Sequence, residues 1–397
     1  VLDDSTDETC AIVDREVARL REEGLDARVL RRTARAGFKA GALAAGTAAA
    51  RADLFAIFDA DFVPEPDFLR QLVGAFDDPG VGMVQARWGH ANRDESWLTR
   101  AQATLLDGHF VMEHQFRHER GLFFNFNGTA GIWRRAAIEA GGGWRSDTLT
   151  EDLDLSYRAQ LAGWRFVYAP GVVAQAEIPP TLAAFQSQQQ RWSKGSAQVL
   201  RKLGAPIVRA RQPIAVKLEA LAHLSSNVGY PLILGLSLLV PASVLLNTPG
   251  SARLGALAFV LCTCTVLAFY ETSQRVIGRP LLARLADVIV AVALGIGMSV
   301  GQTRAVGEGL RGRASEFVRT PKRGDGRSPG YRPASRGRPW SELAVCAWLL
   351  LGLGAAVARG SWGALPFLAL LLAGYGWVAA LRLGERAAST ESATAPV

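Results

Sequence analysis

The uneven distribution of apolar residues constrains the fold more than any other feature of the sequence. Up to about residue 220, charged and apolar stretches alternate as in a soluble domain, whereas long apolar runs dominate after about residue 225. The chain has 397 residues, 49% of them hydrophobic, so it is long enough for two domains. We therefore expect a soluble N-terminal domain followed by a membrane region.

Four apolar runs have lengths that suit membrane spans: 228–247, 254–270, 342–358 and 363–381. A fifth run, 281–301, contains Arg284 and Asp287, and its uncharged part extends only from Val288 to about Val300. That part is short for a span, so we expect an interfacial or re-entrant helix there.

The charge distribution supports four spans. The segment 302–340 holds ten Lys/Arg and three acidic residues, in a chain whose net charge is +8. If 281–301 does not cross, this basic segment shares a side with the soluble domain, and the positive-inside rule makes that side cytoplasmic. A basic cluster beside membrane spans does not require nucleic acid as a partner. The Arg/Ala/Gly-rich composition favours a bacterial inner membrane.

The chain begins with Val1 inside an expected strand end and has no initiator Met, so we expect an earlier strand to be missing. None of the four cysteines forms a CxxC pair, which argues against a zinc site or a disulfide framework. The expected organisation is a soluble domain (1–180), interfacial helices (181–225), a membrane region (226–385) and a tail (386–397). The membrane region includes a cytoplasmic interfacial and gating segment at 271–341.

Residues 1–180 alternate strand and helix patterns, which predicts a layered α/β fold. "VLDD" and "ARVLRR" have strand patterns, "CAIVDREVARLREEG" and "KAGALAAGTAAA" have helix patterns, and "LFAIFDADF" is a buried strand. Sheets of this kind bind ligands at the carboxyl ends of their strands. Asp3, Asp4, Asp59 and Asp61 are expected at such ends.

Two D-x-D pairs differ in geometry. Asp59 and Asp61 follow a strand, where side chains at i and i+2 point the same way and can hold one cation. Asp152 and Asp154 lie at a helix start, where two residues subtend about 200°. The first pair is therefore the better candidate for Mg²⁺ or Mn²⁺.

The stretch "TLTEDLDLSYRAQLAGW" (148–164) allows two interpretations. Thr148 and Glu151 have the spacing of a capping box, and acidic residues favour the first turn of a helix. Alternatively, one of the carboxylates performs a reaction. Lys39, at the start of the "KAGAL" helix, suits a phosphate. The "QQQRW" segment suits an interfacial helix with Trp192 and Arg191 at the headgroup level.

The ordered motifs "DDSTDE", "KAGAL", "FDADF", "TED" and "QQQRW" resemble those of family 2 glycosyltransferases of the processive, membrane-embedded type. Longer stretches such as "DADFVPEPDFL", "VQARWGH" and "FFNFNGTAGIWRR" are most similar to the cellulose-synthase-like mannan and glucomannan synthases. "FVRTPK" is similar to the gating loop of cellulose synthases, which would involve Phe317, Thr320 and Lys322, but Arg319 departs from its pattern.

The resemblance implies a GT-A fold, a nucleotide-sugar donor and specific residue roles. Asp152 matches the catalytic base, and Asp59 and Asp61 match the metal–diphosphate motif. The implied donor-site residues are Asp3, Asp4, Lys39, Gln188 and Arg191, and the implied acceptor-site residues are Trp192 and Glu151. Because the family's first strand is absent, this chain is expected to lack part of the donor site.

The resulting hypothesis is an inverting synthase that makes β-1,4-mannan or glucomannan from GDP-mannose and moves the growing polysaccharide across the lipid. A base raises the rate of hydroxyl attack by about 10²–10⁴-fold. A cellulose- or hyaluronan-type synthase using a UDP-sugar such as UDP-glucose is the first alternative. A lipid-linked sugar transferase and a non-catalytic membrane protein are the others.

Overall fold

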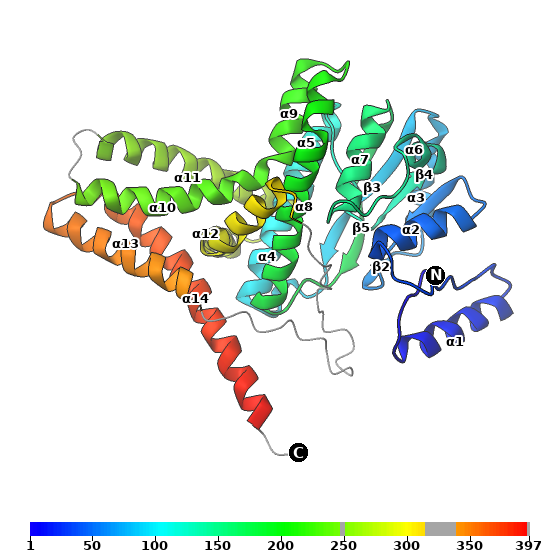
Figure 1. Ribbon diagram of the computed structural model, residues 1–397, viewed down its shortest axis with the longest axis horizontal. Coiled ribbons are helices and arrows are strands. Elements are labelled where there is room, and N and C mark those ends of the chain that lie inside the picture. Colours follow the sequence, from blue (N-terminus) through cyan, green and yellow to red (C-terminus); the bar gives the residue numbers. More distant parts are fainter. Residues whose placement is uncertain (247–250, 314–338, 395–397) are drawn as a thin grey trace.

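A five-stranded mixed sheet forms the centre of the N-terminal half. The computed structural model describes residues 1–246, 251–313 and 339–394. The strand order is β1-β4-β3-β5-β2 (Figure 1). β3 and β5 are parallel, and the other neighbours pair antiparallel. The strands are β1 (Leu54–Ile57), β2 (Phe62–Pro64), β3 (Val81–His90), β4 (Gly131–Arg134) and β5 (Arg165–Ala176).

Helices cover both faces of this sheet because successive strand side chains point to opposite sides. Met83 of β3 packs in one buried cluster with Leu43 and Leu155, and Val84 packs in another with Phe68. The first cluster lies under α2 (Phe38–Ala49), α6 (Arg135–Ala140) and α7 (Glu151–Leu161), and the second under α3 (Phe68–Val73). The α/β prediction is thus confirmed.

The two N-terminal strands expected from "VLDD" and "ARVLRR" do not join the sheet. They are reduced to an isolated parallel bridge between Leu2 and Leu30. The helix between them, α1 (Thr9–Glu22), lies at the edge of the molecule away from the sheet (Figure 1). A single pair of strands is marginal without further strands or a covering helix, which explains the difference.

A group of helices connects the sheet to the apolar part of the chain. Five residues separate the end of β5 from the start of α8, which is followed by α9. α4 and its continuation lie between β3 and β4 in the sequence. These elements are α4 (Trp97–Asp107), a π-helical turn (Gly108–His114), α5 (Gln115–Glu119), α8 (Leu182–Arg209) and α9 (Ile214–Leu224).

The second half consists of long helices: α10 (Gly229–Leu245), α11 (Ser251–Val276), α12 (Leu281–Leu310), α13 (Trp340–Ala358) and α14 (Leu365–Thr394). In the described part of the chain, four helical segments are long and apolar enough to cross a membrane: Ser226–Leu245, Leu281–Leu310, Trp340–Ala358 and Trp362–Ala387.

The segment 281–301, for which the sequence predicts an interfacial or re-entrant helix, belongs to α12. This is one unbroken helix of 30 residues whose length and composition alone would allow a span. The expected span 254–270 falls in α11, whose first nine residues have no described side chains.

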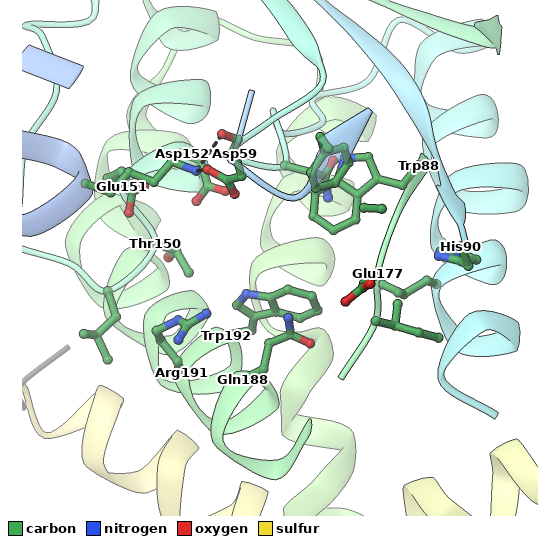
Figure 2. A pocket seen from close by; sticks show the side chains of 18 of the residues that line it. Asp59, Trp88, His90, Thr150, Glu151, Asp152, Glu177, Gln188, Arg191 and Trp192 are labelled. Carbon is green, nitrogen blue, oxygen red and sulfur yellow. Dashed lines mark hydrogen bonds and ion pairs between the residues drawn. The ribbon is translucent and has the colours of Figure 1, made fainter. Parts of the chain in front are cut away.

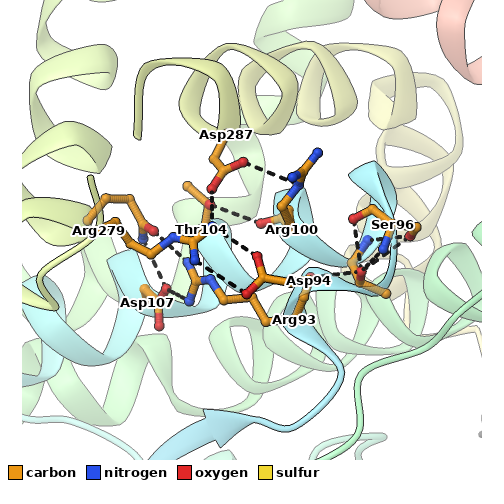
Figure 3. Close-up of polar contacts among 10 residues, drawn as sticks. Arg93, Asp94, Ser96, Arg100, Thr104, Asp107, Arg279 and Asp287 are labelled. Carbon is orange, nitrogen blue, oxygen red and sulfur yellow. Dashed lines mark hydrogen bonds and ion pairs between the residues drawn. The ribbon is translucent and has the colours of Figure 1, made fainter. Parts of the chain in front are cut away.

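The direction of α12 differs from that of its neighbours. In Figure 1, α10, α11 and α13 run across the view, whereas α12 is seen steeply end-on between them and α4. Asp287, in its second turn, is 1% exposed and forms ion pairs with Arg279 (3.1 Å) and with Arg100 of α4 (3.5 Å) (Figure 3). α12 is therefore tied to the N-terminal half by buried charges.

Candidate active site

One pocket collects most of the residues singled out in the sequence. It lies at the ends of β3 and β5 and at the starts of α7 and α2, with α8 along one side (Figure 2). The predicted site residues that line it are Lys39, Asp59, Glu151, Asp152, Gln188, Arg191 and Trp192. These residues are spread along the chain from Lys39 to Trp192, so only the fold brings them together.

Asp152 lies in the first turn of α7, where its Oδ1 accepts a hydrogen bond from the backbone N–H of Leu153 at 2.8 Å. Burial, and then the neighbouring carboxylate of Glu151, raise the pKa of Asp152 to about 7. Burial also raises the pKa of Glu151, although Lys39 opposes that effect. A carboxylate with a pKa near neutrality has the proton affinity that a general base needs.

Lys39 occupies the first turn of α2 and reaches across the pocket. Its ammonium group pairs with the carboxylate of Asp59 and donates a 2.9 Å hydrogen bond to the carbonyl of Gly128. Burial alone would lower the pKa of Lys39, but Asp59 and Glu151 outweigh burial and raise it. Lys39 is thus a fixed positive charge among carboxylates.

The loop around Gly128 forms the floor of the site. Its φ of +83° favours glycine, and a Cβ there would lie 2.9 Å from Oδ2 of Asp152. The neighbouring Thr129 accepts a hydrogen bond from the backbone N–H of Asp59 at 2.9 Å. The "NFNGTAG" stretch therefore holds both carboxylate-bearing segments in place.

The predicted metal pair lies between β1 and β2. The side chain of Asp59 is 42% exposed and lines the pocket, whereas Asp61 is not among the lining residues. No group of three or more His, Cys, Asp or Glu suited to a metal occurs among the described residues. A pair of hard carboxylate oxygens fits a Mg²⁺- or Mn²⁺-like ion that takes its other ligands from phosphates and water.

Arg191 and Trp192 enter from the third turn of α8. Burial lowers the pKa of Arg191, against the opposing charges of Glu151 and Asp152. Gly195, one turn later, allows α8 to approach the start of α7, because a Cβ there would lie 2.5 Å from the side chain of Thr150. This close contact sets the "QQQRW" residues opposite the "TED" residues.

Other predicted residues lie elsewhere. Asp3 pairs with Arg31 at 2.9 Å and Asp4 with Arg32 at 2.5 Å, and neither lines the pocket. The hydrogen bond from Ser5 lowers the pKa of Asp3, against the effect of burial. The gating residues Phe317, Thr320 and Lys322 lie outside the described residues.

The capping box expected between Thr148 and Glu151 is absent. The N-cap of α7 is Thr150, and its side chain makes no capping bond. Thr148 instead donates to the carbonyl of Thr150 at 3.4 Å. Asp154 turns away from the pocket, as its helical position predicts, and pairs in the interior with Arg158 (2.7 Å) and Lys202 (2.8 Å).

Several lining residues had no role predicted from the sequence, among them Trp88, His90, Asn127, Gly128 and Glu177. Trp88 and His90 lie in "VQARWGH" and Asn127 and Gly128 in "FFNFNGTAGIWRR", two stretches that already carried the family resemblance. Glu177 carried no signal, because a single acidic residue after a strand is common. Its position could be recognised only from the fold.

Comparison with known proteins identifies the family of this chain. The model of the family described as Glycosyltransferase like family 2 matches residues 1–195. Glucomannan 4-beta-mannosyltransferase 9 of Arabidopsis thaliana is 34% identical over 357 residues, which cover 82% of this chain and 67% of that protein. The chain belongs to the family 2 glycosyltransferases, and its N-terminal half has their GT-A fold.

Within this family, the chain is similar to the cellulose-synthase-like glucomannan mannosyltransferases. Glucomannan 4-beta-mannosyltransferase 2 of Arabidopsis thaliana is 38% identical over 338 residues, covering 77% of this chain and 63% of that protein. The chain thus spans roughly two thirds of the length of these relatives. Among solved structures, mannosyltransferase PcManGT from Pyrobaculum calidifontis, in complex with GDP-Man and Mn²⁺, has a TM-score of 0.49 and 22% identity, covering 75% of this chain and 76% of its own.

Proposed function

We propose that the protein is an inverting, processive glycosyltransferase that extends a β-1,4-mannan or glucomannan with GDP-mannose as donor. The names of its relatives support this product. The observation that carries the proposal is the position of Asp152, a carboxylate with a raised pKa that shares one pocket with Lys39, Arg191 and Trp192. This combination suits sugar transfer from a diphosphate to a hydroxyl.

Each group then has a role. Asp152 takes the proton of the acceptor hydroxyl as this oxygen attacks the anomeric carbon, and Lys39 and Arg191 offset the charge of the departing diphosphate. Attack opposite the leaving group inverts the anomeric carbon. The indole of Trp192 packs against the terminal sugar of the acceptor, and Glu151 hydrogen-bonds at the edge of that sugar. Gln188 contributes to the donor site.

A divalent cation would be held by Asp59 and Asp61. When bound, it would stabilise negative charge on the diphosphate. Asp3 and Asp4 remain proposed donor contacts. Both are paired with arginines here, so contact with a nucleotide requires these pairs to rearrange.

The membrane arrangement is part of the same proposal. We place the GT-A domain (1–180) and the interfacial helices (181–225) in the cytoplasm and the membrane region at 226–385. α12 lies along the interface within the cytoplasmic segment 271–341. Its direction, which differs from that of α10 and α13 in Figure 1, and the buried ion pairs of Asp287 support this placement. A bacterial inner membrane rests on composition alone, and the relatives named above are from a plant.

The full-length protein in membranes, offered GDP-mannose or UDP-glucose with Mg²⁺ or Mn²⁺, tests the function. We expect radiolabelled polymer from GDP-mannose that a β-mannanase degrades. Polymer from UDP-glucose alone, degraded by a cellulase, would favour the UDP-sugar alternative. No polymer and no glycolipid from either donor would refute the synthase.

A further inference from the structure

The end of the pocket away from Asp152 is formed by two parallel strands that finish together. Trp88 of β3 lies opposite Ala174 of β5, and His90 lies opposite Ala176. The next residue of the second strand is Glu177, so Trp88 and Glu177 both reach the pocket from the carboxyl edge of the sheet. Ligands bind at such edges in α/β sheets.

The backbone around Glu177 is held from both sides. The N–H of Ala91 donates to the carbonyl of Ala176 at 2.9 Å. The side-chain amide of Asn92 then binds both backbone groups of Ile178, each at 2.9 Å. Glu177 therefore projects from a fixed segment, which limits the entropy lost when its carboxylate binds a ligand.

The side chain of Trp88 is also fixed by its contacts. Its ring contacts Phe62 edge-on at 5.1 Å and Phe110 at 5.2 Å between centroids. Its indole N–H points to the carbonyl of Thr129 at 3.5 Å. These contacts fix the plane of an aromatic side chain that also lines the pocket.

Figure 2 shows how the two ends differ. Asp59, Glu151 and Asp152 lie together at one end, and Trp88 and Glu177 lie at the other, with Trp192 between them. The carboxylate of Glu177 points toward the indole of Trp192. His90 adds little to recognition here, because its side chain is 4% exposed and faces Asp107 at 3.3 Å.

The side chains at the Trp88 and Glu177 end of the pocket determine which kind of ligand can bind there. A carboxylate repels the donor's diphosphate. The groups that offset phosphate charge are at the other end: Lys39 pairs with Asp59 there, and Arg191 lies on that side in Figure 2. A pyranose combines an apolar C–H face, which packs on an aromatic ring, with a rim of hydroxyl donors, which a carboxylate accepts strongly. A neutral sugar suits Trp88 and Glu177, whereas a second phosphate does not.

We propose that Glu177 and Trp88 form a second acceptor subsite, which binds the sugar one unit behind the terminal residue on Trp192. This rests on the proposed function and extends it. The subsite holds the growing chain by its last two sugars, so that the terminal hydroxyl faces Asp152. The protein then prefers an acceptor of two linked sugars to a single one.

The experiment measures transfer from saturating GDP-mannose to mannose and to a β-1,4-linked mannose disaccharide, by the full-length protein in membranes. We expect the disaccharide to have the lower KM in the wild type. Glu177→Gln, which keeps size and removes charge, should raise the disaccharide KM about tenfold and leave kcat and the monosaccharide KM almost unchanged. Trp88→Leu should act in the same direction.

Glu65→Gln is the matched control, since it makes the same chemical change at an exposed position outside the pocket, and it should change neither KM. Equal loss for both acceptors in Glu177→Gln, or a wild type without preference for the disaccharide, would overturn the subsite while leaving the transferase intact. A wild type that transfers no sugar to either acceptor refutes the proposed function itself.

Discussion

Two charged clusters of the protein differ in their balance of positive and negative groups. The interhelical cluster joins α4 to the segments around α11 and α12 and contains three arginines and three aspartates: Arg93, Arg100, Arg279, Asp94, Asp107 and Asp287 (Figure 3). The charged end of the pocket has three carboxylates, Asp59, Glu151 and Asp152, but only two cations, Lys39 and Arg191.

This imbalance has a direct consequence for proton affinity. In the cluster, hydrogen bonds and charges from His90 and Arg93 outweigh burial and lower the pKa of Asp107. In the pocket, burial and the carboxylate of Glu151 raise the pKa of Asp152. Balanced buried charges hold helices together, whereas the surplus carboxylate can accept a proton during a reaction.

The largest expected effect comes from removing that carboxylate. Asp152→Asn should lower kcat by about 10³-fold, because an amide cannot act as the base, while the Kd for the donor changes little. Initial polymer synthesis and donor binding by calorimetry measure the two quantities. Asp154→Asn is not a suitable control, since Asp154 is buried in ion pairs. Unchanged turnover in Asp152→Asn would remove it as the base.

A change in the interhelical cluster should affect stability and not chemistry. Asp287→Asn leaves Arg279 and Arg100 without a buried partner and should cost about 3 kcal/mol of unfolding free energy. Asp94→Asn is the matched control: it removes the other carboxylate bound to Arg279, but Asp94 is 61% exposed, so the expected loss is below about 1 kcal/mol.

Thermal unfolding in detergent compares these two variants, with donor affinity as the second readout. Equal shifts of the unfolding midpoint in Asp287→Asn and Asp94→Asn would contradict the expectation that a buried ion pair contributes more to stability than an exposed one. A large change in donor affinity without loss of stability would mean that the cluster takes part in the pocket's chemistry.

The smallest expected effect is a pH dependence of about fivefold. Because the pKa of Asp152 is raised to about 7, the carboxylate form predominates above pH 7 and is lost as the pH falls. Activity, as kcat/KM, should therefore fall by about fivefold between pH 7 and pH 6, as for one base that is half titrated at pH 7. A rate that stays constant down to pH 5 would show that the carboxylate has an ordinary pKa in the working enzyme.

Acid unfolding does not produce the same profile, because the raised pKa acts on stability with the opposite sign. Between the ordinary value of 3.8 and about 7, the folded protein binds a proton at Asp152 that the unfolded chain releases. This group therefore stabilises the fold more as the pH falls through that window. Stability measured alongside activity separates the two effects.

The motifs in the sequence selected residues that the fold brings together. Lys39, Asp59, Asp152 and Trp192 all line one pocket. The N-terminal strands were wrong because a strand pattern forms a strand only where partners are available. The partners of Asp287 could not be read from the sequence, because one of them, Arg100, lies on α4.

By itself, the sequence determined the family, the division into a layered α/β half and an apolar helical half, and a set of candidate site residues. These depend on local periodicity and on short ordered motifs. Only the tertiary structure decided which carboxylates carry a raised pKa and that Glu177 and Trp88 share one pocket with Trp192. Both depend on burial and on contacts between segments that are distant in the sequence, so neither can be predicted from the spacing of residues along the chain.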